Sequence, residues 1–139
     1  MIAVDSSVLI ELIGGGAGAD AAEGVLHAAL SDGTVVACEV VVAEVVAGLG
    51  SGAVVMEVLE DIGIAFSALQ QRAAVRAGEM QRRYKERLRT GGALAAGTRT
   101  VPDFLIGAHA MMQCDALITR DAGFYRDYFK GLKLVVPQA

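Results

Sequence analysis

Short apolar runs alternate with longer segments of helical periodicity along the 139 residues of the chain. Four runs have the apolar, often β-branched composition of buried strands: 2–4, 34–37, 63–66 and 116–119. Apolar side chains recur at helical spacing in six other segments: 8–12, 19–30, 39–49, 54–59, 67–88 and 103–111. This alternation predicts an α/β fold, a three-layer α/β/α sandwich around a central, mainly parallel sheet.

The length predicts a single domain covering residues 1–139, large enough to bury roughly two thirds of its unfolded surface. Charges interrupt every apolar run before the ~20 residues that a membrane span requires, so the 54% hydrophobic content indicates a buried sheet. Asp5 and Glu11 also interrupt the first apolar stretch, which is unlike a secretory leader. We therefore expect no membrane partner and a cytoplasmic location.

Four acidic residues lie beside or within separate apolar stretches: Asp5, Glu44, Asp103 and Asp121. Asp5 and Asp121 follow predicted strands, and the carboxyl ends of parallel strands share one edge of the sheet. Asp103 begins a predicted helix, and Glu44 lies near the middle of another. A carboxylate in apolar surroundings is costly unless its charge is compensated, and one divalent cation would compensate all four.

The available ligand types favour a hard cation. Carboxylate oxygens suit Mg²⁺ or Mn²⁺, whereas neither Cys38 nor Cys114 lies in a spacing typical of zinc sites. We expect His109 to be a core or helix-surface residue, because no Ser or Cys constellation accompanies it. A bound Mg²⁺ or Mn²⁺ would support hydrolysis of a phosphodiester.

The charge is distributed unevenly. The chain carries −4 overall, but the segment from Arg72 to Arg89 holds seven basic and two acidic residues, which leaves −9 for the remainder. One interpretation is a solvated helix with a Glu79–Arg83 pair. The other is a basic guide that leads a polyanion to the metal site. The predicted substrate-binding residues are Arg82, Arg83, Lys85, Arg87 and Arg89.

Four short strings in order resemble the pattern of PIN domains, specifically VapC-type toxins: Val4-Asp5-Ser6-Ser7-Val8-Leu9, Ala43-Glu44, Pro102-Asp103-Phe104-Leu105-Ile106-Gly107-Ala108 and Leu117-Ile118-Thr119-Arg120-Asp121. Phe124 and the C-terminal Leu134-Val135-Val136-Pro137 extend the resemblance over nearly the whole chain. It implies a Mg²⁺- or Mn²⁺-dependent endoribonuclease, a homodimer that a VapB-type antitoxin holds inactive by placing its tail in the acidic pocket.

The resemblance also assigns roles to residues. Asp5, Glu44, Asp103 and Asp121 would be catalytic, and the three aspartates would hold the metal. Ser7 or Thr119 would give polar support.

The sequence departs from the family pattern at one place. Many relatives carry another acidic residue where this chain has Gly123, so a second metal would bind weakly or not at all, and Asp127 is an uncertain substitute.

Three other interpretations remain open. The chain could be a PIN-fold module that binds RNA or a partner without turnover. It could be a phosphate-accepting receiver, although the paired acids and the lysine expected there are missing. The four acids could also be ordinary helix-surface charges and caps.

Overall fold

The computed structural model describes residues 1–91 and 99–138, which form seven helices and a five-stranded parallel sheet. The strands are β1 (Ile2–Val4), β2 (Val35–Ala37), β3 (Ala65–Phe66), β4 (Ala116–Ile118) and β5 (Lys133–Val135). The helices are α1 (Ser6–Gly14), α2 (Ala19–Asp32), α3 (Glu39–Leu49), α4 (Gly52–Ile62), α5 (Gln71–Gly91), α6 (Val101–Gln113) and α7 (Ala122–Tyr128).

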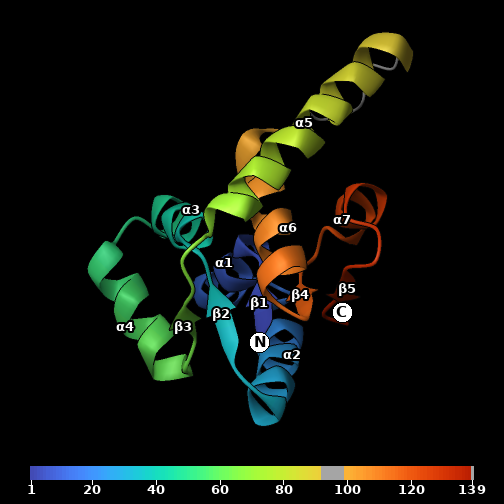
Figure 1. Cartoon of the computed structure of the whole chain (residues 1–139). Helices are drawn as coiled ribbons and strands as arrows, with labels where there is room; N and C mark the ends of the chain where they lie inside the picture. The colour runs from blue at the N-terminus through green and yellow to red at the C-terminus, as the bar shows by residue number, and fades with distance from the viewer. Residues whose placement is uncertain (92–98, 139) are drawn as a thin grey trace.

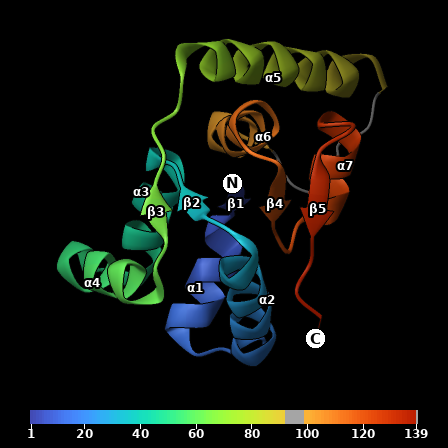
Figure 2. The same ribbon diagram turned by 60° about the horizontal axis from the view of Figure 1, so that its bottom comes forward.

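The sheet has the strand order β3-β2-β1-β4-β5, so the first strand lies in its centre. Ile2 aligns with Val35 of β2 on one side and with Ala116 of β4 on the other. Helices α1 and α2 cover one face and α6 the other, while α5 packs outside α6 (Figure 1, Figure 2). Every residue of β2 and β4 is buried, as expected for strands covered on both faces. The predicted three-layer α/β/α sandwich is confirmed.

Helix α5 runs antiparallel to α6 and projects beyond it (Figure 1). Its beginning is fixed to the end of α6, because the Gln70 amide donates to Gln113 Oε1 over 2.9 Å and the Arg72 guanidinium donates to the Met112 carbonyl over 2.8 Å. Helix α5 has 21 residues and α6 has 13, so roughly 12 Å of α5 extends past the start of α6, at 1.5 Å per residue. The carboxyl ends of the strands point in the same direction.

An aromatic cluster holds α5, α6 and α7 together. Phe104 lies at its centre with a relative exposure of 0%, and its ring is 5.1 Å from Phe124, 5.6 Å from Tyr84 and 5.7 Å from Tyr128. Gly107 lets α6 approach another ring of the cluster, Phe129, because a Cβ on residue 107 would lie 2.3 Å from that ring. The cluster therefore fixes the first turn of α6, which carries Asp103.

Several predicted boundaries were wrong. The strand predicted at 63–66 contains only Ala65 and Phe66, and the long basic helix begins at Gln71 rather than Ser67. Helix α4 is longer than the predicted 54–59, and α6 begins at Val101, with Pro102 in its first turn. Helix α7 and strand β5 were not predicted as elements.

Part of the expected glycine-rich loop, 90–100, cannot be compared. Thr90 and Gly91 belong to α5, and residues 92–98 lie outside the described part of the chain. None of the helices in the described ranges combines the length and the apolar character needed to cross a bilayer.

Candidate functional site

Asp5 lies at the carboxyl end of the central strand, at the start of α1, and is buried with a relative exposure of 5%. Its carboxylate makes no capping hydrogen bond to α1. It accepts instead from Thr119 Oγ1 over 2.7 Å and, more weakly, from Tyr125 Oη over 3.4 Å. Ser7 Oγ also donates to the Asp5 carboxylate, over 3.4 Å. The side chain is thus held by polar groups from α1, from the end of β4 and from α7 without serving a helix end.

Glu44 reaches the same place from α3. Ser6 Oγ is 2.8 Å from Glu44 Oε1 and 3.4 Å from Asp5 Oδ1, so one hydroxyl links the two carboxylates. Burial raises the pKa of Glu44, the Ser6 hydrogen bond opposes that shift, and the charges of Asp5 and Asp103 add to it. A mid-helix glutamate therefore belongs to the same electrostatic group as Asp5.

Asp103 and Asp121 occupy helix starts. The Asp103 carboxylate accepts from the Thr100 amide over 3.1 Å, so the interpretation of this residue as a helix cap is correct in part. Asp121 precedes α7 and makes no capping bond with its side chain. Its two oxygens pair with the guanidinium of Arg99, whose pKa this contact raises.

The charges of the predicted acids act on Asp5 and on Tyr125. Burial raises the pKa of Asp5, the Thr119 hydrogen bond opposes the shift, and the charges of Asp121 and Asp103 raise it further. Burial, followed by the charges of all four acids, also raises the pKa of Tyr125. Within residues 1–91 and 99–138, only part of this negative charge is compensated, since Arg99 is paired with Asp121 alone among the four acids. An additional cation would therefore relieve repulsion at this edge of the sheet.

A divalent metal ion fits the donor chemistry. The carboxylates of Asp5, Asp103 and Asp121 offer only oxygen, the ligand that Mg²⁺ and Mn²⁺ prefer. With the side chains as they stand in the described ranges, no three His, Cys, Asp or Glu residues form a group that could hold one ion. Because Arg99 already binds both oxygens of Asp121, a metal at Asp121 would have to compete with this guanidinium.

Three members of the site were not predicted as such. Arg99 lies at the end of the glycine-rich stretch, Tyr125 is in the unpredicted helix α7, and Ser6 was part of the first motif without a role of its own in the site. For Arg99, the available signal was a lone basic residue four positions before Asp103. Of the two predicted supporting hydroxyls, Thr119 makes the shorter hydrogen bond to Asp5.

The other sequence-based candidates lie outside the acidic group. His109 is in the core with a relative exposure of 1% and lies 3.0 Å from Ser67 Oγ, and burial lowers its pKa. Asp127 lines a groove between α5 and α7. A Cβ at Gly123 would meet nothing within 4 Å, so packing does not require glycine there.

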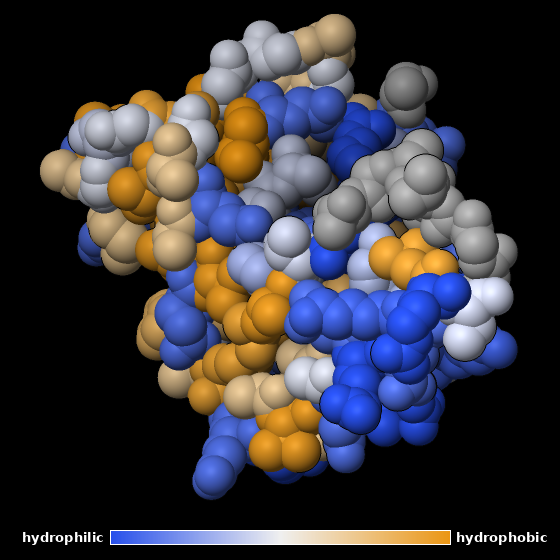
Figure 3. Space-filling model, turned by 90° about the horizontal axis from the view of Figure 1, so that it is seen from above, coloured by the Kyte–Doolittle hydropathy of each residue, from blue (hydrophilic) through white to orange (hydrophobic). Residues whose placement is uncertain are grey.

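The basic helix borders this edge of the sheet. Seen from above, hydrophilic side chains gather in the middle and the lower right of the molecule, where α5 ends, and apolar side chains flank them on the left (Figure 3). The i,i+4 ion pair recorded on α5 joins Arg82 to Glu86 at 3.5 Å, not the expected Glu79–Arg83 pair.

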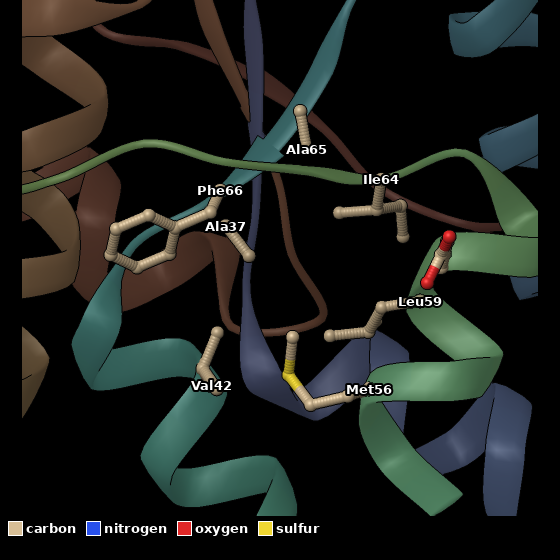
Figure 4. A pocket seen from close by; sticks show the side chains of 8 residues that line it. Ala37, Val42, Met56, Leu59, Ile64, Ala65 and Phe66 are labelled. Carbon is tan, nitrogen blue, oxygen red and sulfur yellow. The ribbon is translucent and has the colours of Figure 1, made fainter. Parts of the chain in front are cut away.

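A separate pocket of about 480 Å³ lies between α3, α4 and β3. Val42, Met56, Leu59 and Ile64 point into it, and Phe66 lies at its side (Figure 4). Among the described residues that line it, Glu60 is the one ionisable side chain, so this pocket lacks the paired groups of an acid–base site.

Comparisons with known proteins agree with this architecture. The family model of the PIN domain matches residues 2–130. Similar solved structures include VapBC2 from Rickettsia felis bound to a promoter DNA fragment (TM-score 0.74, 18% identity, covering 99% of this chain and 100% of that one). A toxin–antitoxin complex from Klebsiella pneumoniae has a TM-score of 0.63 at 20% identity, covering 99% and 98%. FitAcB from Neisseria gonorrhoeae has a TM-score of 0.65 at 20% identity, with the same coverage. A search of curated protein sequences found no significant match.

Proposed function

The chain belongs to the PIN domain family, and from this membership we propose that it is a Mg²⁺- or Mn²⁺-dependent endoribonuclease, the toxin of a toxin–antitoxin pair. One observation carries the proposal. Four acidic side chains from four separate segments share one electrostatic environment at the carboxyl edge of a parallel sheet, where such folds bind ligands. Asp5, in particular, is buried without a helix-capping bond, which suits a ligand better than a structural role.

The proposed roles follow from the surroundings of each residue. Asp5, Asp103 and Asp121 would hold the metal, which when bound would neutralise charge on the phosphate and lower the pKa of water. Glu44 has a raised pKa and a fixed hydrogen bond to Ser6, which suits a group that accepts a proton. Thr119 and Tyr125 orient Asp5. Basic residues of α5 would bind the phosphates of the RNA.

The proposed protein partners are a VapB-type antitoxin and a second copy of the chain. Support for the antitoxin comes from the similar structures, which are toxin–antitoxin complexes.

Support for the association of two copies of the chain comes from Val54, Met56 and Phe66, whose exposed fractions are 54%, 52% and 60%. We expect a light-scattering mass of about twice 14.4 kDa, the mass of one chain. A monomeric mass at micromolar concentration would contradict the homodimer. The cytoplasmic location stays a prediction.

One alternative keeps the fold without the reaction. A catalytically weak PIN-fold module that binds RNA or a partner is favoured by Gly123, which stands where many relatives place another acid, and by the pairing of Asp121 with Arg99. Such a module would bind RNA without cleaving it under any divalent metal.

The test is an RNA cleavage assay with the purified chain, free of any antitoxin. Total RNA is incubated with Mg²⁺ or Mn²⁺, with metal plus excess EDTA, and with an Asp103→Asn variant, in which the amide oxygen can still accept from Thr100. We expect discrete RNA fragments that require both the metal and Asp103. RNA binding without fragments would favour the alternative, and cleavage that persists in EDTA would contradict the metal-dependent mechanism.

A further inference from the structure

A basic groove of about 300 Å³ lies between α5 and α7. Its walls carry four cationic side chains and one acidic side chain: Arg76, Arg83, Arg87, Lys130 and Asp127. Tyr128 lines its side, and Met80 and Met111 contribute apolar surface. On a chain with a net charge of −4, this local excess of positive charge indicates an anionic ligand.

Helix geometry divides the basic residues of α5 into two sets. At 100° per residue, Arg76, Arg83 and Arg87 fall on one stripe next to the buried stripe of Ala77 and Tyr84. Three others, Arg82, Lys85 and Arg89, fall on the opposite face of the helix. Arg83 and Arg87 are exposed like these three, so the two sets differ in direction and not in exposure. The first set therefore lines the groove, while the second is directed away from it.

The upper end of the groove is connected to the acidic site through two aromatic rings. The Arg87 guanidinium lies over the Tyr128 ring at 5.1 Å, and that ring is 5.5 Å from Phe124. Arg99 lies over Phe124 at 4.5 Å and pairs with Asp121. Phe124 is buried, so this row of contacts is packed rather than open, and it places the Arg87 end of the groove near the acidic site.

We propose that this groove binds the single-stranded RNA next to the cleaved phosphate, with Arg83, Arg87 and Lys130 as its main phosphate contacts, an inference that rests on the proposed nuclease function. The paired planes of Arg87 and Tyr128 give a surface on which an unstacked base can lie. In this proposal the groove residues, rather than Arg82, Lys85 and Arg89 on the opposite face of α5, are the principal substrate contacts.

The test measures RNA binding without cleavage. A fluorescent single-stranded RNA of about 12 nucleotides, within the usual range of single-strand site sizes, is titrated with the full chain in EDTA and followed by anisotropy. The groove variant is Arg83→Gln with Arg87→Gln. Its matched control is Arg82→Gln with Arg89→Gln, which removes the same charge from the same helix. Urea unfolding midpoints check that both variants keep the fold.

We expect the groove variant to bind RNA about 10-fold more weakly than the unmodified chain near 0.1 M salt, and the control to change less than about 2-fold. The slope of log Kd against log salt should fall by about 1.4 in the groove variant, at 0.7 per lost phosphate contact. Lys130→Gln should weaken binding in the same direction.

Three results would overturn the inference. One is an equal loss of affinity in both double variants, and another is no loss in either. The third is competition by a polyglutamate peptide as strong as by unlabelled RNA, which would indicate a site for an acidic protein segment. The nuclease proposal is tested separately, because the binding assay contains no metal. If the unmodified chain cleaves RNA and the groove variant binds RNA with unchanged affinity, only the groove proposal is rejected. If the groove variant loses RNA affinity but the unmodified chain cleaves no RNA, only the proposed reaction is rejected.

Discussion

Replacing Asp5 by asparagine is expected to reduce metal-dependent RNA cleavage by about 10²-fold or more, because losing about 3 kcal/mol of transition-state stabilisation changes a rate by that factor. The amide removes the charge that would hold the metal but keeps an oxygen that can accept from Thr119, 2.7 Å away. The measurement is the initial cleavage rate at saturating Mn²⁺, compared with the unmodified chain. An unchanged rate would exclude Asp5 from the reaction.

The same substitution should leave the metal-free fold at least as stable at pH 7. The pKa of Asp5 is raised in the folded chain, chiefly by burial, so the carboxyl group favours folding most at low pH and loses that contribution as the pH rises through its folded pKa. Asparagine carries no such charge. The urea midpoint of the variant, measured in EDTA, should therefore match or exceed that of the unmodified chain at pH 7, and its advantage should shrink toward acidic pH. A variant clearly less stable at pH 7 would indicate that Asp5 is mainly structural.

The acidic group could be predicted from the sequence because its members are tied to the topology. Asp5 directly follows β1, Asp121 lies three residues after the end of β4, and parallel strands place their carboxyl ends together. Glu44 and Asp103 were grouped with them as further acids beside apolar stretches, and the resemblance to PIN domains gave the same set. The charge of Asp103 contributes to the raised pKa of both Asp5 and Glu44. Their chemical roles stay predictions.

The neighbours of these acids could not be predicted, because their positions depend on long-range packing. Arg99 meets Asp121 across 22 residues, and Tyr125 meets Asp5 across 120. No local periodicity encodes either contact. Helix α7 has only seven residues, and β5 begins with the exposed Lys133 and is only partly buried, so neither gives a clear pattern in one sequence.

The basic segment shows the same limit in another form. Its charge excess is evident from composition, but composition treats Arg82 and Arg83 alike. Packing separates them, because α7 lies along only one side of α5 and converts one stripe of the helix into a groove. The proposed choice among these arginines therefore depends on a helix that the sequence did not predict.

Replacing Phe104 by alanine is expected to lower the free energy of unfolding by about 3–5 kcal/mol, the usual cost of deleting a buried aromatic ring. The ring is fully buried and contacts aromatic side chains from both α5 and α7. That loss is a large share of the roughly 5–15 kcal/mol that stabilises a typical domain. Urea unfolding followed by circular dichroism measures this free energy. The value for Phe104→Leu should fall between those of the unmodified chain and of Phe104→Ala.

The matched control for this prediction is Phe66→Ala, which removes the same ring from a position where 60% of the residue is exposed. We expect it to change the free energy of unfolding by about 0.5 kcal/mol or less, as surface substitutions usually do. Equal losses in the two variants would contradict the placement of Phe104 at the centre of the cluster.

Because Asp103 directly precedes Phe104 in the first turn of α6, a loosened Phe104→Leu chain should also bind Mn²⁺ more weakly, whereas Phe66→Ala should not. Unchanged Mn²⁺ binding by Phe104→Leu would indicate that the acidic edge does not depend on this packing.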